Sequence, residues 1–271
     1  MSRFSGLVRA CHPEPALAVT VCAGLLALSS GRGAGSLLVM AAVGSGQLFV
    51  GWSNDYLDRD RDRVAGRRDK PISSDQVAAS SVRRGALLAL AGCTPLSLLL
   101  GPAAASAHAA ALLSGFVYNW RGKFAPWSPL PYAISFALLP AVVSLGLRPP
   151  HLPASWVMIA GACIGVAGHF AQVLADIPED RRQGSRGLPQ LLGQRTSVSV
   201  SAVLLFAAML LVTLGPGPPG AAALTALAAA TCLTVAVPIS AFLGRLKLAF
   251  RLTLLVAGLA VAGFALEHVS L

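Results

Sequence analysis

The sequence has few charged residues. Only 12% of its 271 residues are Asp, Glu, Lys or Arg, whereas 55% are hydrophobic; in a soluble domain roughly 25% of residues are charged. This composition excludes a soluble globular enzyme and a disordered chain. About nine spans of about 20 residues would use most of the chain, which leaves no room for a separate soluble domain. We expect one integral membrane domain over residues 1–271.

Cysteine and aromatic residues are also scarce. The five cysteines are an odd number without a Cys-x-x-Cys pair, which excludes a disulfide framework and a zinc site of the usual spacing. Aromatic residues make up only 6%. The net charge of +10 does not indicate nucleic-acid binding, because no basic soluble module accompanies it.

Nine long apolar segments follow one another along the chain, and we interpret each as a membrane span. Their approximate ranges are 14–31, 35–56, 84–100, 103–120, 129–147, 154–176, 197–214, 219–243 and 249–267. With nine spans, nearly all basic residues fall on one side, and only Arg32 and Arg148 fall on the other. The positive-inside rule then predicts a cytoplasmic N-terminus and an outside C-terminus.

Nine of the eleven acidic residues lie in two short stretches, 55–75 and 176–180. In the first stretch, Asn54, Asp58 and Asp62 follow a spacing of four residues, so a continuous helix would align them on one stripe. Gln47 lies on the same stripe, deeper in the apolar span. Asp60 points away from it.

The second stretch has the same spacing at Asp176 and Asp180, with His169 and Gln172 on the same helix face. Like charges one helical turn apart repel each other. Mg²⁺ removes this cost and is typically held by one or two carboxylates together with substrate phosphates. The two stretches therefore predict a Mg²⁺–diphosphate site on the cytoplasmic side. The alternative is two solvated helix ends paired with arginines.

The pattern Asn-Asp-x-x-Asp-x-x-x-Asp at 54–62, followed by Asp-x-x-x-Asp at 176–180, resembles the UbiA superfamily of intramembrane prenyltransferases. Further similar elements are Lys70-Pro71-Ile72, Tyr118 with Lys123, and the stretch 187–193. The resemblance implies an all-α bundle of nine transmembrane helices around a central cavity. It also implies a Mg²⁺ cofactor and a prenyl diphosphate substrate.

Carried over by position, the resemblance assigns roles to residues of this chain. The metal ligands are Asn54, Asp58, Asp62, Asp176 and Asp180, and the catalytic residues are Asp58, Asp176, Tyr118 and Lys123. The expected substrate-binding residues are Arg67, Arg68, Lys70, Arg121, Lys123, Gln47, His169 and Gln172. Arg121 is an alternative to Lys123, because the spacing from Tyr118 to Lys123 differs from that in some members.

Two further departures bear on geometry. Lys70 stands where an arginine is more usual, which keeps the charge but loses bidentate binding of phosphate. Pro178 lies inside the second acidic motif. Since proline is tolerated in the first turn of a helix but not in its interior, we expect the sixth helix to end near Asp176 and a short helix to start at Pro178.

The predicted reaction is transfer of an isoprenyl group to an aromatic or quinone-precursor acceptor in a bacterial cell membrane, with the active-site loops cytoplasmic. The candidate aromatic walls of the cavity are Phe49, Trp52, Phe116, Tyr132, Phe136 and Phe170. The main alternative is a terpene cyclase that ionises the same donor without an acceptor. A CDP-alcohol phosphotransferase lacks support because its Asp-Gly-x-x-Ala-Arg block is missing, and a transporter would place acidic residues near the bilayer midplane.

Overall fold

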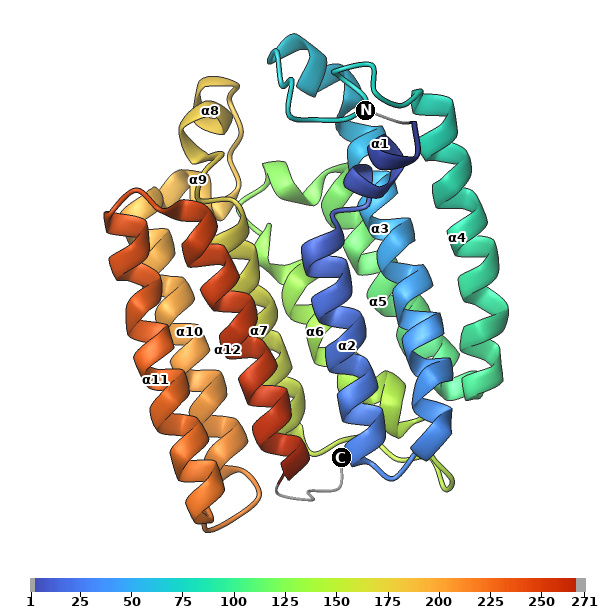
Figure 1. Ribbon diagram of the computed structural model, residues 1–271, viewed down its shortest axis with the longest axis vertical. Helices are drawn as coiled ribbons and strands as arrows, with labels where there is room; N and C mark the ends of the chain where they lie inside the picture. The colour runs from blue at the N-terminus through green and yellow to red at the C-terminus, as the bar shows by residue number, and fades with distance from the viewer. Residues whose placement is uncertain (1–2, 267–271) are drawn as a thin grey trace.

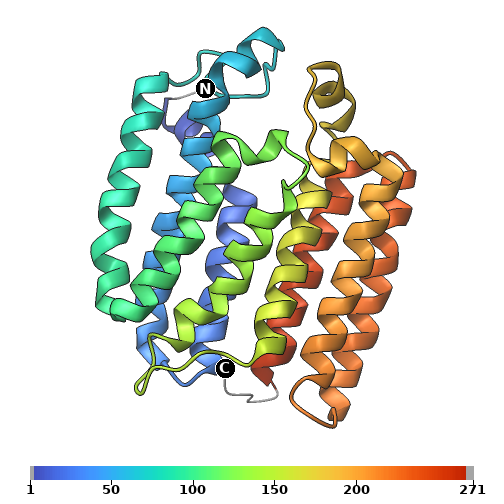
Figure 2. The same ribbon diagram turned by 180° about the vertical axis from the view of Figure 1, so that it is seen from behind.

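The protein is a bundle of helices packed side by side (Figures 1 and 2). The structure is a computed structural model and describes residues 3–266, in which all regular elements are helical. In chain order the α-helices are α1 (Arg3–Ala10), α2 (Pro13–Ser29), α3 (Ser36–Val64), α4 (Ala79–Leu100), α5 (Pro102–Trp120), α6 (Pro129–Ser144), α7 (Ser155–Gln172), α8 (Ile177–Arg182), α9 (Leu188–Leu192), α10 (Gln194–Leu214), α11 (Ala221–Phe242) and α12 (Leu246–Leu266). Two short 3-10 helices are η1 (Gly33–Gly35) and η2 (Gly122–Phe124).

Each of the nine predicted apolar segments coincides with one long helix of the described chain, namely α2 to α7 and α10 to α12. Six helices are long and apolar enough to cross a membrane, or seven if α1 and α2 count as one bent span, while α6 has only 16 residues. The all-helical membrane fold is therefore confirmed, but the count of nine spans stays a prediction. Residue 267, the predicted end of the last span, lies outside the described residues.

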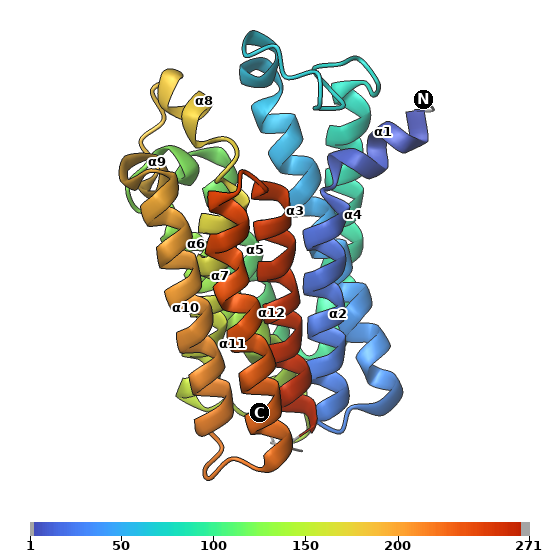
Figure 3. The ribbon, with the colours of Figure 1, turned by 60° about the vertical axis from the view of Figure 1, so that its left-hand side comes forward.

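Six of the long helices form a ring. α2 packs against α3, α3 against α5, α5 against α6, α6 against α7, α7 against α12, and α12 against α2 again. The remaining three, α4, α10 and α11, lie outside this ring, as Figure 3 shows for α10 and α11. The ring encloses space that belongs to no single helix pair, so it is the part of the fold that positions a site.

Small residues allow the helices of the ring to approach closely. Gly161 and Gly165 of α7 lie one turn apart against α6, and a Cβ on Gly165 would come within 2.6 Å of the carbonyl oxygen of Tyr132. Membrane helices commonly use such small residues at their contacts, because apolar side chains gain little by leaving lipid. All five cysteines are free, as the sequence predicted.

The charged residues gather at one end of the bundle. α1, the segment between α3 and α4, and α8 with α9 all lie at the upper end in Figure 1. Arg32 and Arg148, the two predicted exceptions, lie in the connections α2–α3 and α6–α7 at the opposite end. This arrangement agrees with the charge asymmetry of the sequence. The assignment of the charged end to the cytoplasm stays a prediction.

The sixth long span ends earlier than predicted. α7 stops at Gln172, four residues before Asp176, and α8 begins at Ile177 with Pro178 in its first turn. Proline has no N–H and its ring clashes with the carbonyl group four residues earlier, so it disfavours the interior of a helix and is tolerated in the first turn, where Pro178 lies in α8. The predicted break is present. The turn that precedes it places Asp176 at the N-terminus of the short helix.

Candidate active site

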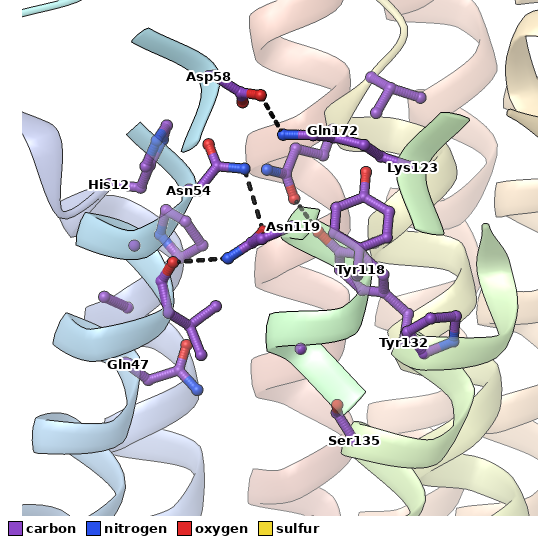
Figure 4. Close-up of a pocket in the computed structure, with 18 of the residues that line it drawn as sticks. His12, Gln47, Asn54, Asp58, Tyr118, Asn119, Lys123, Tyr132, Ser135 and Gln172 are labelled. Carbon is purple, nitrogen blue, oxygen red and sulfur yellow. Dashed lines mark hydrogen bonds and ion pairs between the residues drawn. The ribbon is translucent and has the colours of Figure 1, made fainter. Parts of the chain in front are cut away.

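A cavity of about 280 Å³ opens within the ring of helices at its charged end. Its lining comes from all six helices of the ring, from the segment after α3, and from α8. Figure 4 shows a close-up of part of this lining. The outer helices α4, α10 and α11 contribute no lining residue. A polar, charged mouth therefore sits on a cavity whose deeper walls are mostly apolar membrane helices.

The first acidic stripe lies in this lining. α3 continues without a break through Val64, so Asn54, Asp58 and Asp62 fall on the face that lines the cavity. Asp60 points the other way, with its side chain 74% exposed and paired with Arg59 at 3.0 Å. The helical spacing in the sequence thus correctly separates the cavity-facing acids from the solvated one.

The second acidic stretch faces the first across the cavity mouth. Asp176 and Asp180 both line the cavity. Arg67 donates from Nη1 to Oδ1 of Asp176 at 3.1 Å, and Arg61 of α3 donates from Nη2 to Oδ1 of Asp180 at 2.9 Å. Arg61 belongs to the first motif and Arg67 follows it, and both therefore bind carboxylates of the second motif.

The electrostatics of this mouth favour bound anions and cations together. Burial raises the pKa of Asp176, and Arg67 offsets part of that shift. The pKa of Arg67 is raised, first by its hydrogen bonds to Asp69 and further by Asp176, so this guanidinium stays charged. Burial alone would lower the pKa of Lys70, but the carboxylates of Asp55, Asp62 and Asp58 together outweigh it and the net shift is upward.

Lys123 and Tyr118 line the opposite wall (Figure 4). The Lys123 ammonium donates a hydrogen bond to Asp58. Burial lowers the pKa of Lys123, although Asp58 acts in the opposite direction. The Tyr118 ring packs edge-on against Tyr132 with centroids 4.8 Å apart, and the Tyr132 hydroxyl donates to Oε1 of Gln172 at 3.0 Å.

An amide pair fixes the orientation of Asn54. Its Nδ2 donates to Oδ1 of Asn119 at 3.1 Å, while Asn119 Nδ2 donates to the Val50 carbonyl at 2.9 Å and to Ser53 Oγ at 3.1 Å (Figure 4). With Nδ2 engaged in this way, the Asn54 carbonyl oxygen has no hydrogen-bond donor assigned to it in the described chain. It is the atom that a hard cation would use.

Most of the predicted site residues meet at this cavity. The predicted residues in its lining are Gln47, Asn54, Asp58, Asp62, Arg67, Lys70, Tyr118, Lys123, Gln172, Asp176 and Asp180. Arg68, Arg121 and His169 are not in the lining. The Arg121 guanidinium lies over the Trp120 ring, 5.3 Å from its centroid. His169 is buried behind the wall, with Nε2 3.1 Å from Ser128 Oγ.

The aromatic prediction holds for two residues only. Tyr132 and Phe136 of α6 line the cavity, whereas the other four candidates lie outside the lining. The other four are Phe49, Trp52, Phe116 and Phe170. Whether an aromatic residue lines the cavity depends on which face of its helix it occupies. In segments that are apolar on all sides, the spacing of apolar and polar residues does not show which face is turned inward.

Several polar residues of the lining were not predicted from the sequence, among them His12, Arg61, Asn119 and Gln190. Two of them carry a recognisable signal. Asn119 is an amide inside an apolar span, and His12 is an ionisable residue at the start of one, both of which are functional hypotheses by default. Arg61 and Gln190 look like ordinary loop or helix-end residues until the fold brings both to Asp180, with Gln190 Nε2 2.8 Å from Oδ2.

The donor set fits Mg²⁺ in one specific manner. Among the described residues, no three Asp, Glu, His or Cys side chains converge closely enough to hold an ion by themselves. Instead, carboxylates alternate with Arg61, Arg67 and Lys123 around the mouth. This arrangement fits a cation that takes one or two carboxylates from the protein and the rest of its ligands from phosphate and water.

Fold and cavity together define an all-α membrane protein with a charged site at one end of an internal, mostly apolar cavity. The family model of the UbiA prenyltransferase family matches residues 17–249. The chain therefore belongs to this family, as the acidic motifs predicted, and its apolar helices are those of an integral membrane protein.

Individual relatives agree with this assignment. Digeranylgeranylglyceryl phosphate synthase of Methanothrix thermoacetophila is 30% identical over 167 residues, which cover 60% of this chain and 61% of that protein. The match thus spans about three fifths of the relative's length.

Among solved structures, a UbiA homologue from Aeropyrum pernix superimposes with a TM-score of 0.78 at 22% identity, over 94% of this chain and 98% of that one. A UbiA homologue from Archaeoglobus fulgidus bound to GPP and Mg²⁺ gives a TM-score of 0.66 at 13% identity, over 95% and 99%. These identities show a shared fold. All three relatives are archaeal, so they do not support the bacterial cell membrane that we expected from the sequence.

Proposed function

We propose that this protein is a Mg²⁺-dependent prenyltransferase that moves the prenyl group of a prenyl diphosphate onto a lipophilic acceptor. The observation that carries the proposal is the convergence of both acidic motifs, four basic side chains and a tyrosine on one cavity mouth. Mg²⁺-bound prenyl diphosphate in the Archaeoglobus relative supports the same donor and cofactor here.

The reaction requires the allylic C1–O bond to break, with the electron pair leaving on the diphosphate. Bound Mg²⁺ would neutralise charge that develops on the diphosphate. Asn54, Asp58 and Asp176 are its proposed protein ligands, with Asp62 and Asp180 beside them. Breaking the C1–O bond leaves an allylic carbocation, which water would quench at once. The apolar lower cavity therefore serves to exclude water.

The basic side chains hold the leaving group. Arg67 after the first motif and Lys123 on the opposite wall are placed around the same mouth, while Lys70 in the lining beside them is paired with Asp55. With a diphosphate and Mg²⁺ bound, Lys123 and Arg67 would donate to phosphate oxygens in place of Asp58 and Asp176, their present partners. The carboxylates released in this way are then available to the cation. Tyr118 is proposed to hydrogen-bond the phosphate or the bridging oxygen.

The acceptor has two candidate classes. The sequence favours an aromatic or quinone-precursor acceptor, whereas the Methanothrix relative is named for a glyceryl phosphate that carries prenyl groups. Both classes supply a nucleophile that replaces the diphosphate at C1 and releases one proton. The terpene cyclase alternative needs neither class.

The test uses purified protein in lipid with Mg²⁺, a series of prenyl diphosphates, and acceptors of each class. Products are analysed by mass spectrometry, with Asp58→Ala as the blank. A prenylated acceptor formed only by the unmodified protein is the expected result, and its identity selects the acceptor class. A hydrocarbon or terpene alcohol formed without acceptor would assign the cyclase reaction instead. No consumption of any prenyl diphosphate would reject the proposal.

A further inference from the structure

The break between α1 and α2 places a histidine at the edge of the cavity. The two helices are bent by 63° at this break, and His12 has the left-handed backbone conformation, with φ +54°. Such a conformation is uncommon for residues other than glycine and costs free energy, so it persists only where its surroundings impose it. Here the surroundings are α3: Trp52 Nε1 donates to the carbonyl of Leu7 at 2.9 Å and fixes α1 against α3.

A buried carboxylate holds this histidine. Asp55, which is only 2% exposed, accepts from His12 Nε2 at 3.0 Å and from Lys70 Nζ at 2.8 Å, both at Oδ1. Its Oδ2 has no hydrogen-bond partner in the described chain. Lys70 Nζ also lies 3.4 Å from His12 Nε2, but it donates to the carboxylate at the shorter distance of 2.8 Å. Because an ionised carboxylate can only accept, the 3.0 Å contact assigns the hydrogen of the neutral imidazole to Nε2. The lone pair is then on Nδ1.

His12 Nδ1 is free to accept a proton. Across the described residues, no hydrogen bond engages this atom, and the side chain is 31% exposed at the cavity lining. A histidine whose one nitrogen is fixed by a carboxylate has its ring, and therefore its other nitrogen, held in one orientation. This is the same arrangement that general bases use in unrelated enzymes.

Other groups of the lining are less suited to this task. Asp58, Asp176 and Asp180 already bind basic side chains, and Asp62 lies beside Asp58 on the same helix face, where the proposed metal site claims it. His108 also lines the cavity, but it lies ten residues before Tyr118 on α5, which is on the order of 15 Å along the helix. Its Nδ1 is 2.8 Å from Ser97 Oγ, deep in the bundle.

His12 lies across the cavity from Tyr118 and Lys123, with Asn54 and Asp58 on the α3 wall (Figure 4). A donor whose diphosphate is held at the Lys123 wall leaves the His12 side for the second substrate. We propose that His12, oriented by Asp55, is the catalytic base that receives the proton of the acceptor. This inference rests on the proposed prenyl transfer.

The step balances without any further reactant. The C1–O bond breaks with its electron pair on the diphosphate, and an electron pair of the acceptor forms the new bond to C1. The hydrogen that the acceptor atom carried goes as a proton to Nδ1 of His12, and from the imidazolium to solvent at the cavity mouth. Lys70 keeps Asp55 neutralised before the proton arrives, so the carboxylate orients the imidazole without trapping it as a permanent ion pair.

The decisive experiment removes the imidazole and adds it back. His12→Gly tolerates the left-handed backbone conformation and leaves room for a small molecule. We expect its transfer to the acceptor to fall about 10²-fold or more and to recover when free imidazole is added. Exchange of an oxygen isotope between the bridging and non-bridging positions of the prenyl diphosphate reports ionisation without transfer. The rate of this exchange should be the same in His12→Gly as in the unmodified protein.

Two matched variants complete the design. His12→Asn keeps a side chain that adopts the left-handed conformation but cannot accept the proton, so imidazole should not rescue it. His151→Gly changes an exposed histidine at the other end of the bundle and should transfer at the normal rate.

The pH dependence gives an independent readout. The charged groups around His12 are Asp55 of α3, Lys70 of the α3–α4 segment, and the pair of Glu14 with Arg251 of α12. In His12→Gly rescued by a series of substituted imidazoles, the loss of transfer at acidic pH should move with the pKa of the imidazole that is added, because only its neutral form accepts a proton. Normal transfer by His12→Gly, or equal loss of transfer and isotope exchange, would overturn the assignment. If the unmodified protein consumed no prenyl diphosphate at all, the proposed prenyl transfer itself would fall.

Discussion

The backbone of Cys11 lies directly on Gly51 of α3, at the point where α1 turns away from α2. A Cβ on Gly51 would collide with the Cys11 carbonyl group and would come within 3.0 Å of its Cα. Asp55 lies one helical turn further along α3. Because Gly51 has no side chain, Cys11 can lie against α3 there, and this contact places His12 level with the carboxylate of Asp55.

This contact predicts the effect of Gly51→Ala. The added methyl group meets backbone, which cannot rotate away, so the α1–α2 break must shift. We expect a loss of about 1–3 kcal/mol in the free energy of unfolding, measured by denaturant unfolding in detergent. Gly92→Ala on α4 is the matched control, because a Cβ there meets nothing within 4 Å. Equal stability of the two variants would contradict the close contact.

Asp58→Ala and Asp176→Ala should each abolish turnover while the protein still inserts and folds. Each change removes a proposed metal ligand, and Mg²⁺ is held by only one or two carboxylates of the protein beside the phosphates. Prenyl diphosphate consumption is the measurement, and chelation of Mg²⁺ should reproduce the loss in the unmodified protein.

The control for both is Asp60→Ala. Asp60 belongs to the same motif in sequence, but its side chain is 74% exposed and points away from the cavity. We expect normal turnover from this variant. Wild-type activity in Asp58→Ala or Asp176→Ala would reject the metal-site assignment.

Lys123→Met should reduce the rate of ionisation by about 10²–10³-fold, the usual effect of removing one preorganised donor to developing negative charge. Lys123 lines the cavity, whereas Arg121, which the sequence offered as an alternative, packs over Trp120. Arg121→Met should therefore leave the rate nearly unchanged. The two rates, compared at saturating Mg²⁺, decide which basic residue contacts the diphosphate, and a larger loss in Arg121→Met would assign it to Arg121.

The part of the site that the sequence predicted is the part that depends on one helix. Asn54, Asp58 and Asp62 share a face because α3 is continuous, and helical spacing alone determines that. Likewise, the residue type of Pro178 was enough to predict a helix break, although not the turn from Val173 to Asp176 that precedes it.

The remaining part depends on contacts between distant segments. His12 meets Asp55 across 43 residues, and Asn54 meets Asn119 across 65. Neither pair follows a local period, so nothing in the neighbouring sequence marks the partners. His169 shows the converse: helical spacing placed it on the face of Gln172, but its ring turns behind Tyr132 and packs there with centroids 4.8 Å apart.

The final prediction concerns which way the cavity faces. The basic residues cluster at the end that carries the cavity mouth, and the positive-inside rule assigns such an end to the cytoplasm. Single cysteines at Val64 and Arg186, both exposed at the mouth end, should react with a membrane-impermeant maleimide in inside-out vesicles and stay protected in intact cells. A cysteine at Arg148, exposed at the opposite end, should show the reverse pattern. The unmodified chain is the blank for its five native thiols. Protection of both mouth positions in inside-out vesicles would reverse the topology, and the water-soluble diphosphate donor would then have to arrive from outside.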